Sequence, residues 1–232
     1  MSGIIYHPIA RRGAVLLLAA GALLCPPATA QTAGLAGKIA DGNYLSATGE
    51  FKVPVLVLPE LGGVISDTEN VVTFHDDYNV HISIACFAQD AAQKWELDTR
   101  GRRDYLLYFF NEFVLTDFQR RFPGSRIESA RFVPELQDGA LIAYALLPGG
   151  SFFEDKNYIL AAPPIDPVTA KRGTLLFVRN GHIYIISTEL AERATQRSTY
   201  RQSTEKEDSL LADRLTALTG RLIFPAPKPR TP

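Results

Sequence analysis

The sequence has only two cysteines among its 232 residues, Cys25 and Cys86. Cys25 lies in an N-terminal segment that we expect to be removed on export, so the mature chain would keep one thiol and could form no intramolecular disulfide. Cys86 lies in the apolar strand pattern HISIACF, and a buried free cysteine behaves as a small hydrophobic residue. We therefore predict a core without disulfides and an inert Cys86 rather than a reactive one.

Recognisable catalytic and membrane-spanning patterns are missing as well. The sequence contains no GxSxG, no HExxH and no phosphate-cradling glycine loop, which are the local signatures of several hydrolase, metalloprotease and nucleotide-binding classes. No apolar run beyond the N-terminal segment approaches the length of a transmembrane helix. Basic and acidic residues are nearly balanced, 24 against 25. This balance does not suggest the clustered basic surface that nucleic-acid binding favours. We expect no cofactor, no nucleic-acid partner and no transmembrane segment in the mature chain.

Residues 1–30 have the pattern of a cleaved export signal. Arg11-Arg12 form a basic region, an apolar run covers 13–24, and Ala28-Thr29-Ala30 supplies an A-x-A cleavage site. Cleavage there would make Gln31 the first residue of a periplasmic or secreted protein.

A lipoprotein signal is the alternative interpretation because Cys25 follows the apolar run directly. Against it, Leu24 stands where such signals have a small residue, and Pro26-Pro27 follow the cysteine. Ordinary secretion fits the segment better.

The mature sequence divides into three parts. Residues 31–42 are small and polar and are predicted to form a flexible lead-in. Residues 43–224 are enough for a single domain with a sizeable core. Residues 225–232 are rich in proline, which favours an extended tail.

The strongest structural signal is the segment GTLLFVRNGHIYIIST at residues 173–188. Asn180-Gly181 at its middle is the preferred dipeptide of a type I′ turn, which needs positive φ at both central residues. This turn would set Val178 opposite Ile183 and Phe177 opposite Tyr184. Because both faces of the hairpin are then apolar, we predict that it lies at the centre of a sheet covered on both sides.

Other segments fit strands and helices around this hairpin. Alternating patterns predict strands over 43–47, 50–56, 70–75, 80–87, 125–136, 140–147 and 158–162. Helical periodicity predicts one long helix over 104–122, with a core stripe of Leu107, Phe110, Val114, Phe118 and Phe122, and a last helix from about Thr204 with a leucine stripe. Thr204 and Glu207 have capping-box spacing, and 189–202 would be a solvated helix or a loop.

This order of elements predicts an α+β fold, in which one antiparallel sheet carries helices on both faces as a three-layer sandwich. The chain here resembles the Mog1/PsbP-like family. The resemblance lies in Tyr44, Gly49-Glu50-Phe51, Phe177, Ile183-Tyr184 and the leucine-rich last helix, and spans most of the predicted domain. It implies an α/β/α sandwich and a non-enzymatic binding or assembly role.

The densest cluster of possible metal ligands is His75, Asp76, Asp77 and His81, at the tip of the hairpin over 70–87. Histidine and carboxylate groups suit zinc, so a weak divalent site is one interpretation. The alternative is that the aspartates only form the turn, since their side chains bond to nearby backbone groups.

Three further sets of residues are candidates for a ligand or partner surface. His81 and Ser83 form the polar face of an otherwise apolar strand. Glu154-Asp155 could act as paired carboxylates in a hydrolase, and Arg102-Arg103 run against the dipole at a helix start, which favours an anionic partner or an acidic neighbour.

We expect an exported, non-catalytic envelope protein that binds a protein or a small ligand. The first alternative is a periplasmic hydrolase that uses carboxylates or the pair His75 and His81. The second is a structural envelope protein that makes its contacts through the proline-rich tail.

Overall fold

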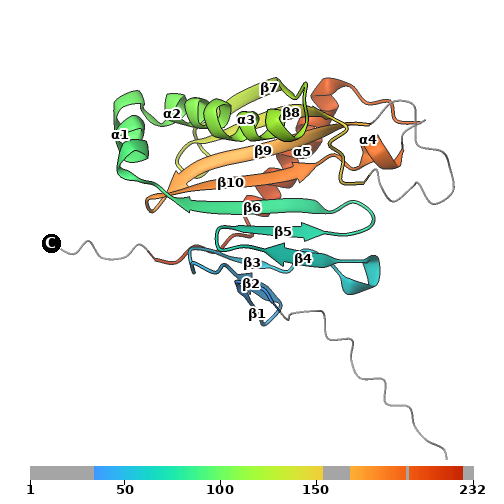
Figure 1. The fold of residues 1–232 in the computed structure, drawn as a ribbon, viewed down its shortest axis with the longest axis horizontal. Helices are drawn as coiled ribbons and strands as arrows, with labels where there is room; N and C mark the ends of the chain where they lie inside the picture. The colour runs from blue at the N-terminus through green and yellow to red at the C-terminus, as the bar shows by residue number, and fades with distance from the viewer. Residues whose placement is uncertain (1–33, 154–167, 197–198, 227–232) are drawn as a thin grey trace, which may run out of the picture. The chain divides into compact units, whose positions relative to one another are not determined.

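A seven-stranded antiparallel sheet forms the middle layer of the computed structural model, which describes residues 34–153, 168–196 and 199–226 (Figure 1). The strand order is β4-β5-β6-β10-β9-β8-β7. The strands are β4 (Val64–Asp67), β5 (Val71–His75), β6 (His81–Ala88), β7 (Arg126–Val133), β8 (Ala140–Pro148), β9 (Thr169–Arg179) and β10 (His182–Glu189). The predicted signal peptide and the predicted strand over 158–162 lie outside the described residues.

The predicted central hairpin is confirmed in position and register. Val178 pairs with Ile183 and Phe177 with Tyr184, and Asn180 and Gly181 have φ values of 51° and 74°. The rings of Phe177 and Tyr184 stack with centroids 4.9 Å apart. β10 and β9 occupy the middle of the strand order, as the two apolar faces of the hairpin require.

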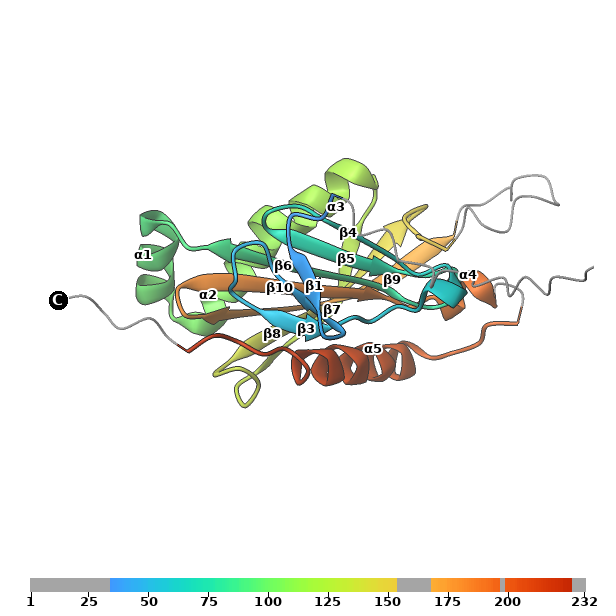
Figure 2. The same ribbon diagram turned by 90° about the horizontal axis from the view of Figure 1, so that it is seen from below.

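Helices cover both faces of this hairpin, as Figure 2 shows from below. On one face lie α1 (Ala91–Arg100), α2 (Arg102–Phe109), the π-helical η2 (Phe110–Leu115) and α3 (Thr116–Arg121); on the other lies α5 (Thr204–Thr219). Leu176 and Ile183 share a core cluster with Phe110 on the first face. Leu175 and Tyr184 pack with the leucines of α5 on the second. The predicted α+β class with helices on both faces of one antiparallel sheet is confirmed.

The long helix predicted over 104–122 differs from the structure in one respect. Its middle turns, Phe110–Leu115, are π-helical, and a π-turn inserts one residue into the helical repeat. The buried stripe therefore shifts toward Tyr105, Leu106 and Phe109, and Leu107 is only half-buried. The predicted core positions Phe110, Val114 and Phe118 are buried; Phe122 is half-buried.

Three short elements, β1, η1 and β4, were not predicted. β1 (Lys38–Ala40) lies in the segment that was expected to be a flexible lead-in, and it joins β2 (Asn43–Leu45) and β3 (Lys52–Pro54) in a separate three-stranded sheet. The carboxylate of Asp67 ties this segment down by accepting hydrogen bonds from the backbone N–H groups of Ala36 and Gly37, at 2.9 and 2.7 Å. The 3₁₀-helix η1 (Pro59–Leu61) precedes β4, which was missed as an edge strand.

The connection 189–202 is not a solvated segment throughout. It contains the short helix α4 (Glu192–Thr195), and its first residues, Glu189, Leu190 and Ala191, are buried. No helix among the described residues combines the length and apolar character needed to cross a membrane.

Candidate ligand-binding site at the β5–β6 turn

The turn between β5 and β6 is built around the carboxylate of Asp76. This carboxylate accepts hydrogen bonds from the backbone N–H groups of Tyr78, Asn79 and Val80 at 2.8–2.9 Å. Burial by itself would raise the pKa of Asp76, but the three N–H groups lower it below its usual value. Asp76 therefore serves as the turn former that the sequence offered as the alternative to a metal ligand.

Two adjoining hollows flank this turn. The larger has a volume of about 520 Å³ and the smaller of about 290 Å³. Asn79 lines both, and an ion pair 2.5 Å long joins Glu192, which lines the larger hollow, to Arg214, which lines the smaller. The larger hollow is lined by Asp77, Tyr78, Asn79, Phe153, Ala191, Glu192, Thr195 and Gln196. The smaller is lined by Leu56, Asn79, Val80, Ile82, Thr188, Arg214, Ala217, Leu218 and Arg221.

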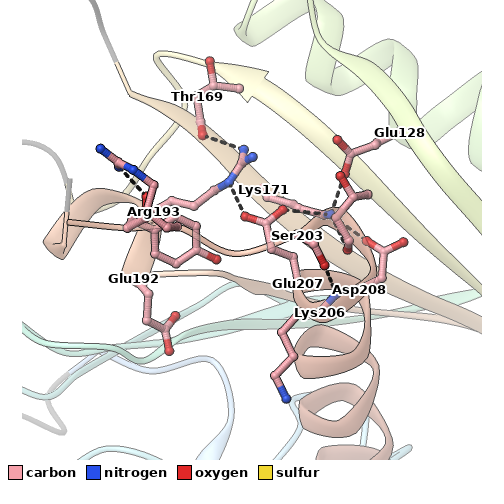
Figure 3. A network of polar contacts seen from close by, with 12 residues as sticks. Glu128, Thr169, Lys171, Glu192, Arg193, Ser203, Lys206, Glu207 and Asp208 are labelled. Atoms are coloured by element: carbon pink, nitrogen blue, oxygen red, sulfur yellow. Dashed lines mark hydrogen bonds and ion pairs between the residues drawn. The ribbon is translucent and has the colours of Figure 1, made fainter. Parts of the chain in front are cut away.

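A buried network of charges holds α4 (Figure 3). Residues of α4 form one wall of the larger hollow. Arg193 of α4 donates from Nε to the carboxylate of Glu207 at 2.8 Å and from Nη1 to the backbone oxygen of Thr169 at 3.2 Å. These contacts fasten α4 to α5 and to the beginning of β9. In Figure 3, Glu192 projects away from the network, which leaves it available to line the hollow.

Lys171 is the centre of this network. Its side chain is fully buried in β9, and its ammonium lies 2.5 Å from Glu128, 2.6 Å from Asp208 and 3.1 Å from Glu207. Burial alone would lower the pKa of Lys171, but the three carboxylates raise it above its usual value. Lys171 and Arg193 thus place two positive charges against three carboxylates, one from β7 and two from α5.

The opposite face of β9 carries a second buried charge, Arg172. Its guanidinium lies 3.6 Å from the carboxylate of Glu189 and donates to the backbone oxygen of Gly150 at 3.3 Å. Glu189 also accepts from the Ser151 hydroxyl at 2.6 Å and from the Phe152 N–H at 3.1 Å. This pair therefore fixes the strap 150–153, whose last residue, Phe153, lines the larger hollow.

His75 and His81 lie side by side beneath the strap. Their ring centroids are 5.7 Å apart; the ring of His75 lies 5.7 Å from that of Phe153, and the ring of His81 stacks on Phe152 at 3.5 Å. Burial, reinforced by the positive charges of Arg172 and His75, lowers the pKa of His81 to about 3. The imidazole of His81 is therefore neutral at physiological pH and acts as a packing group.

The other sequence-predicted residues do not gather at the hollows. Ser83 is half-buried and pairs with Thr73 and Ser187 across the sheet. Arg102 donates to the backbone oxygen of Val178 at 3.0 Å, near the far end of the hairpin, and Arg103 is exposed. Glu154 and Asp155 lie outside the described residues.

Of the predicted metal-ligand cluster, only Asp77 lines a hollow. Within residues 34–153, 168–196 and 199–226, no three His, Cys, Asp or Glu side chains are placed to hold a metal ion together. Cys86 is buried in the core, and burial raises its pKa to about 11. A thiol with a raised pKa is a poor nucleophile.

Of the residues that hold the site together, Lys171 and Arg172 were not singled out from the sequence, and Glu207 was singled out only as part of a capping box. One signal was available. The strand predicted over 140–147 is two residues longer than the apolar segment 173–178, so a partner strand of equal length could extend back through Lys171 and Arg172. The structure pairs Leu146 with Lys171 and Ala145 with Arg172.

Comparisons with known proteins bear on the fold alone. No protein-family model matches the chain, and no curated protein matches it by sequence. Among solved structures, it is similar to the Saccharomyces cerevisiae Ran-binding protein Mog1p, with 10% identity and a TM-score of 0.42 over 76% of this chain and 91% of that one. A mutant of the protein Mog1 gives the same identity and TM-score over 81% of this chain and 95% of the other. Both neighbours are Mog1 structures, so the Mog1-like resemblance extends to the fold and to nothing further.

Proposed function

We propose that the protein is an exported, non-catalytic binding module that takes up a protein segment or a small ligand at the hollows beside the β5–β6 turn. The observation that carries the proposal is the pair of adjoining hollows with mixed polar and apolar walls, since binding sites are typically concave with a few convergent polar groups. Their combined size falls in the range of small-molecule sites. Buried ion pairs that hold α4 and the strap 150–153 support a preformed site.

The chemistry of the nearby groups favours binding over hydrolysis. An acid–base catalyst works best with a pKa near the working pH, and that of His81 lies far below it. The carboxylate of Asp76 is committed to three backbone N–H groups. The Cys86 thiol is buried and has a raised pKa.

Filling the larger hollow tests this function. Thr195 is an exposed residue of α4 that lines the hollow, so the Thr195→Trp variant should occlude it without disturbing the core. Thr99→Trp is a matched control, because Thr99 is an exposed threonine of α1, at the opposite end of the sheet (Figure 1). The mature protein and both variants would be immobilised and exposed to envelope extract, and their melting temperatures measured across a metabolite panel.

We expect the wild type and Thr99→Trp to retain the same component, or to be stabilised by the same metabolite, and Thr195→Trp to lose most of that response. Equal retention by all three proteins would show that the larger hollow is not the binding site. No specific retention together with no stabilisation by any metabolite would contradict the binding function itself.

The proposed export is tested by the mass of the mature protein. Expression of the full sequence in a bacterial host should give a soluble envelope protein that begins at Gln31, as cleavage after Ala30 requires. Cys25→Ser should leave the product unchanged. A mature protein that begins with an acylated Cys25 would instead establish the lipoprotein alternative.

A further inference from the structure

The smaller hollow has an apolar floor that is open to solvent in part. Leu56, Val80 and Ile82 are half-buried there, and Leu218 of α5 is buried behind them. Ile82 of β6 and Val80, which directly precedes β6, pack against the core cluster that contains the leucines of α5. Covering the remaining exposed area of half-buried aliphatic side chains with an apolar group lowers the free energy, because it removes that area from water.

The rim of this hollow is positively charged. Arg214 lies in α5 and Arg221 lies two residues beyond the end of that helix; both line the hollow. Glu192 neutralises Arg214 at 2.5 Å. Arg221 is exposed and makes no ion pair with another described residue, and none of the nine lining residues is acidic. The hollow therefore offers about one uncompensated positive charge beside an apolar surface.

From this combination we infer that the smaller hollow binds an organic monoanion with a short apolar body, such as an aliphatic carboxylate, with the carboxylate on Arg221 and the chain on Leu56, Val80 and Ile82. This inference rests on the proposed binding function and names the ligand class for one of its two hollows. The volume of about 290 Å³ lies at the lower limit of small-ligand sites, so it suits one free small molecule rather than the chains of a membrane lipid. A guanidinium can bind a carboxylate through two parallel hydrogen bonds.

Octanoate is the probe, and three compounds that lack one feature each are its controls. Octanol lacks the charge, octylammonium reverses it, and acetate lacks the chain. Isothermal titration calorimetry of the mature protein at neutral pH and low salt should show binding of octanoate, with at least tenfold weaker binding of each control. Added salt should weaken the octanoate affinity, because the ion pair is solvent-accessible.

Two variants locate the site. Arg221→Gln should weaken octanoate binding about tenfold, the effect of losing one charge-assisted contact. Arg103→Gln, which removes another exposed arginine, should leave the affinity unchanged. Ala217→Trp should abolish binding by filling the hollow, and circular dichroism would verify that each variant is folded.

Equal affinity for octanol and octanoate, or an unchanged affinity in Arg221→Gln, would overturn the inference. So would binding to anionic phospholipid vesicles without binding of free octanoate. If octanoate fails while Thr195→Trp still loses its specific response, the ligand class is wrong and the binding function stands. If wild type and Thr195→Trp also behave alike in every assay, both proposals fail.

Discussion

The two ends of the β9–β10 hairpin are stabilised by different means. At the turn end, Leu176, Val178 and Ile183 are buried among apolar side chains. At the open end, the same two strands bury Lys171, Arg172 and Glu189. The backbone ladder continues through both ends without interruption, so the difference lies in the side chains alone.

The two ends differ in how specific their side chains must be. The apolar end needs only side chains of suitable size, because hydrophobic burial is not directional. The charged end needs particular partners, since an unpaired buried charge is strongly unfavourable. Those partners are remote in sequence: Glu207 is 36 residues from Lys171, and Ser151 is 38 residues from Glu189. The charged end also holds the walls of the two hollows, so stability and the proposed site depend on the same groups.

The largest expected effect is that of Lys171→Met. The variant would keep the apolar stem but leave Glu128, Glu207 and Asp208 without their shared cation. Breaking a buried ion pair from one side costs about 3–5 kcal/mol, so we expect a loss of this size in the free energy of unfolding at pH 7, measured by urea denaturation. Acid should reduce the loss, because protonation removes the unpaired negative charge.

Lys94→Met is the control for this variant, since Lys94 is an exposed lysine of α1 and should change stability by less than about 0.5 kcal/mol. The raised pKa of Lys171 fixes the sign in the wild type: its stabilisation is present below about pH 10.5, the ordinary lysine value, and is lost only as the pH rises through the folded-state pKa. A loss below about 1 kcal/mol in Lys171→Met would mean that the two ends do not differ as described.

Arg172→Met should have the next largest effect, roughly 3 kcal/mol at pH 7, the upper range for a buried group that loses its partner. Glu189 keeps its hydrogen bonds to Ser151 and Phe152, which limits the cost. Burial raises the pKa of Glu189, so this carboxylate should take up a proton in the variant, and the loss should shrink below pH 7. Adding Glu189→Gln should recover part of the stability; a double variant less stable than Arg172→Met would contradict the ion pair.

His81, near Arg172 at the charged end, should make the free energy of unfolding fall by about 2 kcal/mol between pH 6.5 and pH 5. The pKa of His81 is lowered to about 3 in the folded protein, against about 6.5 in the unfolded chain. Between these values the unfolded state binds one more proton than the folded state. The free energy of unfolding is therefore highest above about pH 6.5 and falls by up to about 1.4 kcal/mol per pH unit as the pH drops.

His81→Phe keeps a ring to stack on Phe152 and should flatten this slope between pH 6.5 and 5. His182→Phe, at the turn end of the same hairpin, is the control and should leave most of the slope in place. Urea midpoints at a series of pH values measure both. Equal slopes in wild type and His81→Phe would show that His81 is not the group that titrates.

These differences explain which parts of the fold could be predicted from the sequence. Periodicity and the Asn180-Gly181 turn predicted the central hairpin to the residue, because both signals are local. The start of α5 was placed close to its true position, but its cap was misassigned. Ser203, not Thr204, accepts the capping hydrogen bond, from the N–H of Lys206. Glu207, predicted to complete a capping box, pairs instead with Lys171 and Arg193.

The candidate site was predictable in part for the same reason. The β5–β6 turn was identified from its aspartates, and it does border the two hollows. The other walls come from α4, the strap 150–153 and α5, which reach the turn only through the tertiary fold. Local patterns could not reveal that Arg214 and Val80 line one surface, because no periodicity links residues so far apart.

The smallest expected effect is at the turn end, in Gly181→Ala. Gly181 has a φ of +74°, and a Cβ there would meet no other atom within 4 Å, so the cost is the backbone strain of a left-handed alanine, about 1 kcal/mol. Because no charge is involved, the loss in the free energy of unfolding should be the same at pH 5 and pH 7. A loss that changes with pH as strongly as that of Lys171→Met would show that the electrostatic network extends to the turn, and the contrast between the two ends would then be wrong.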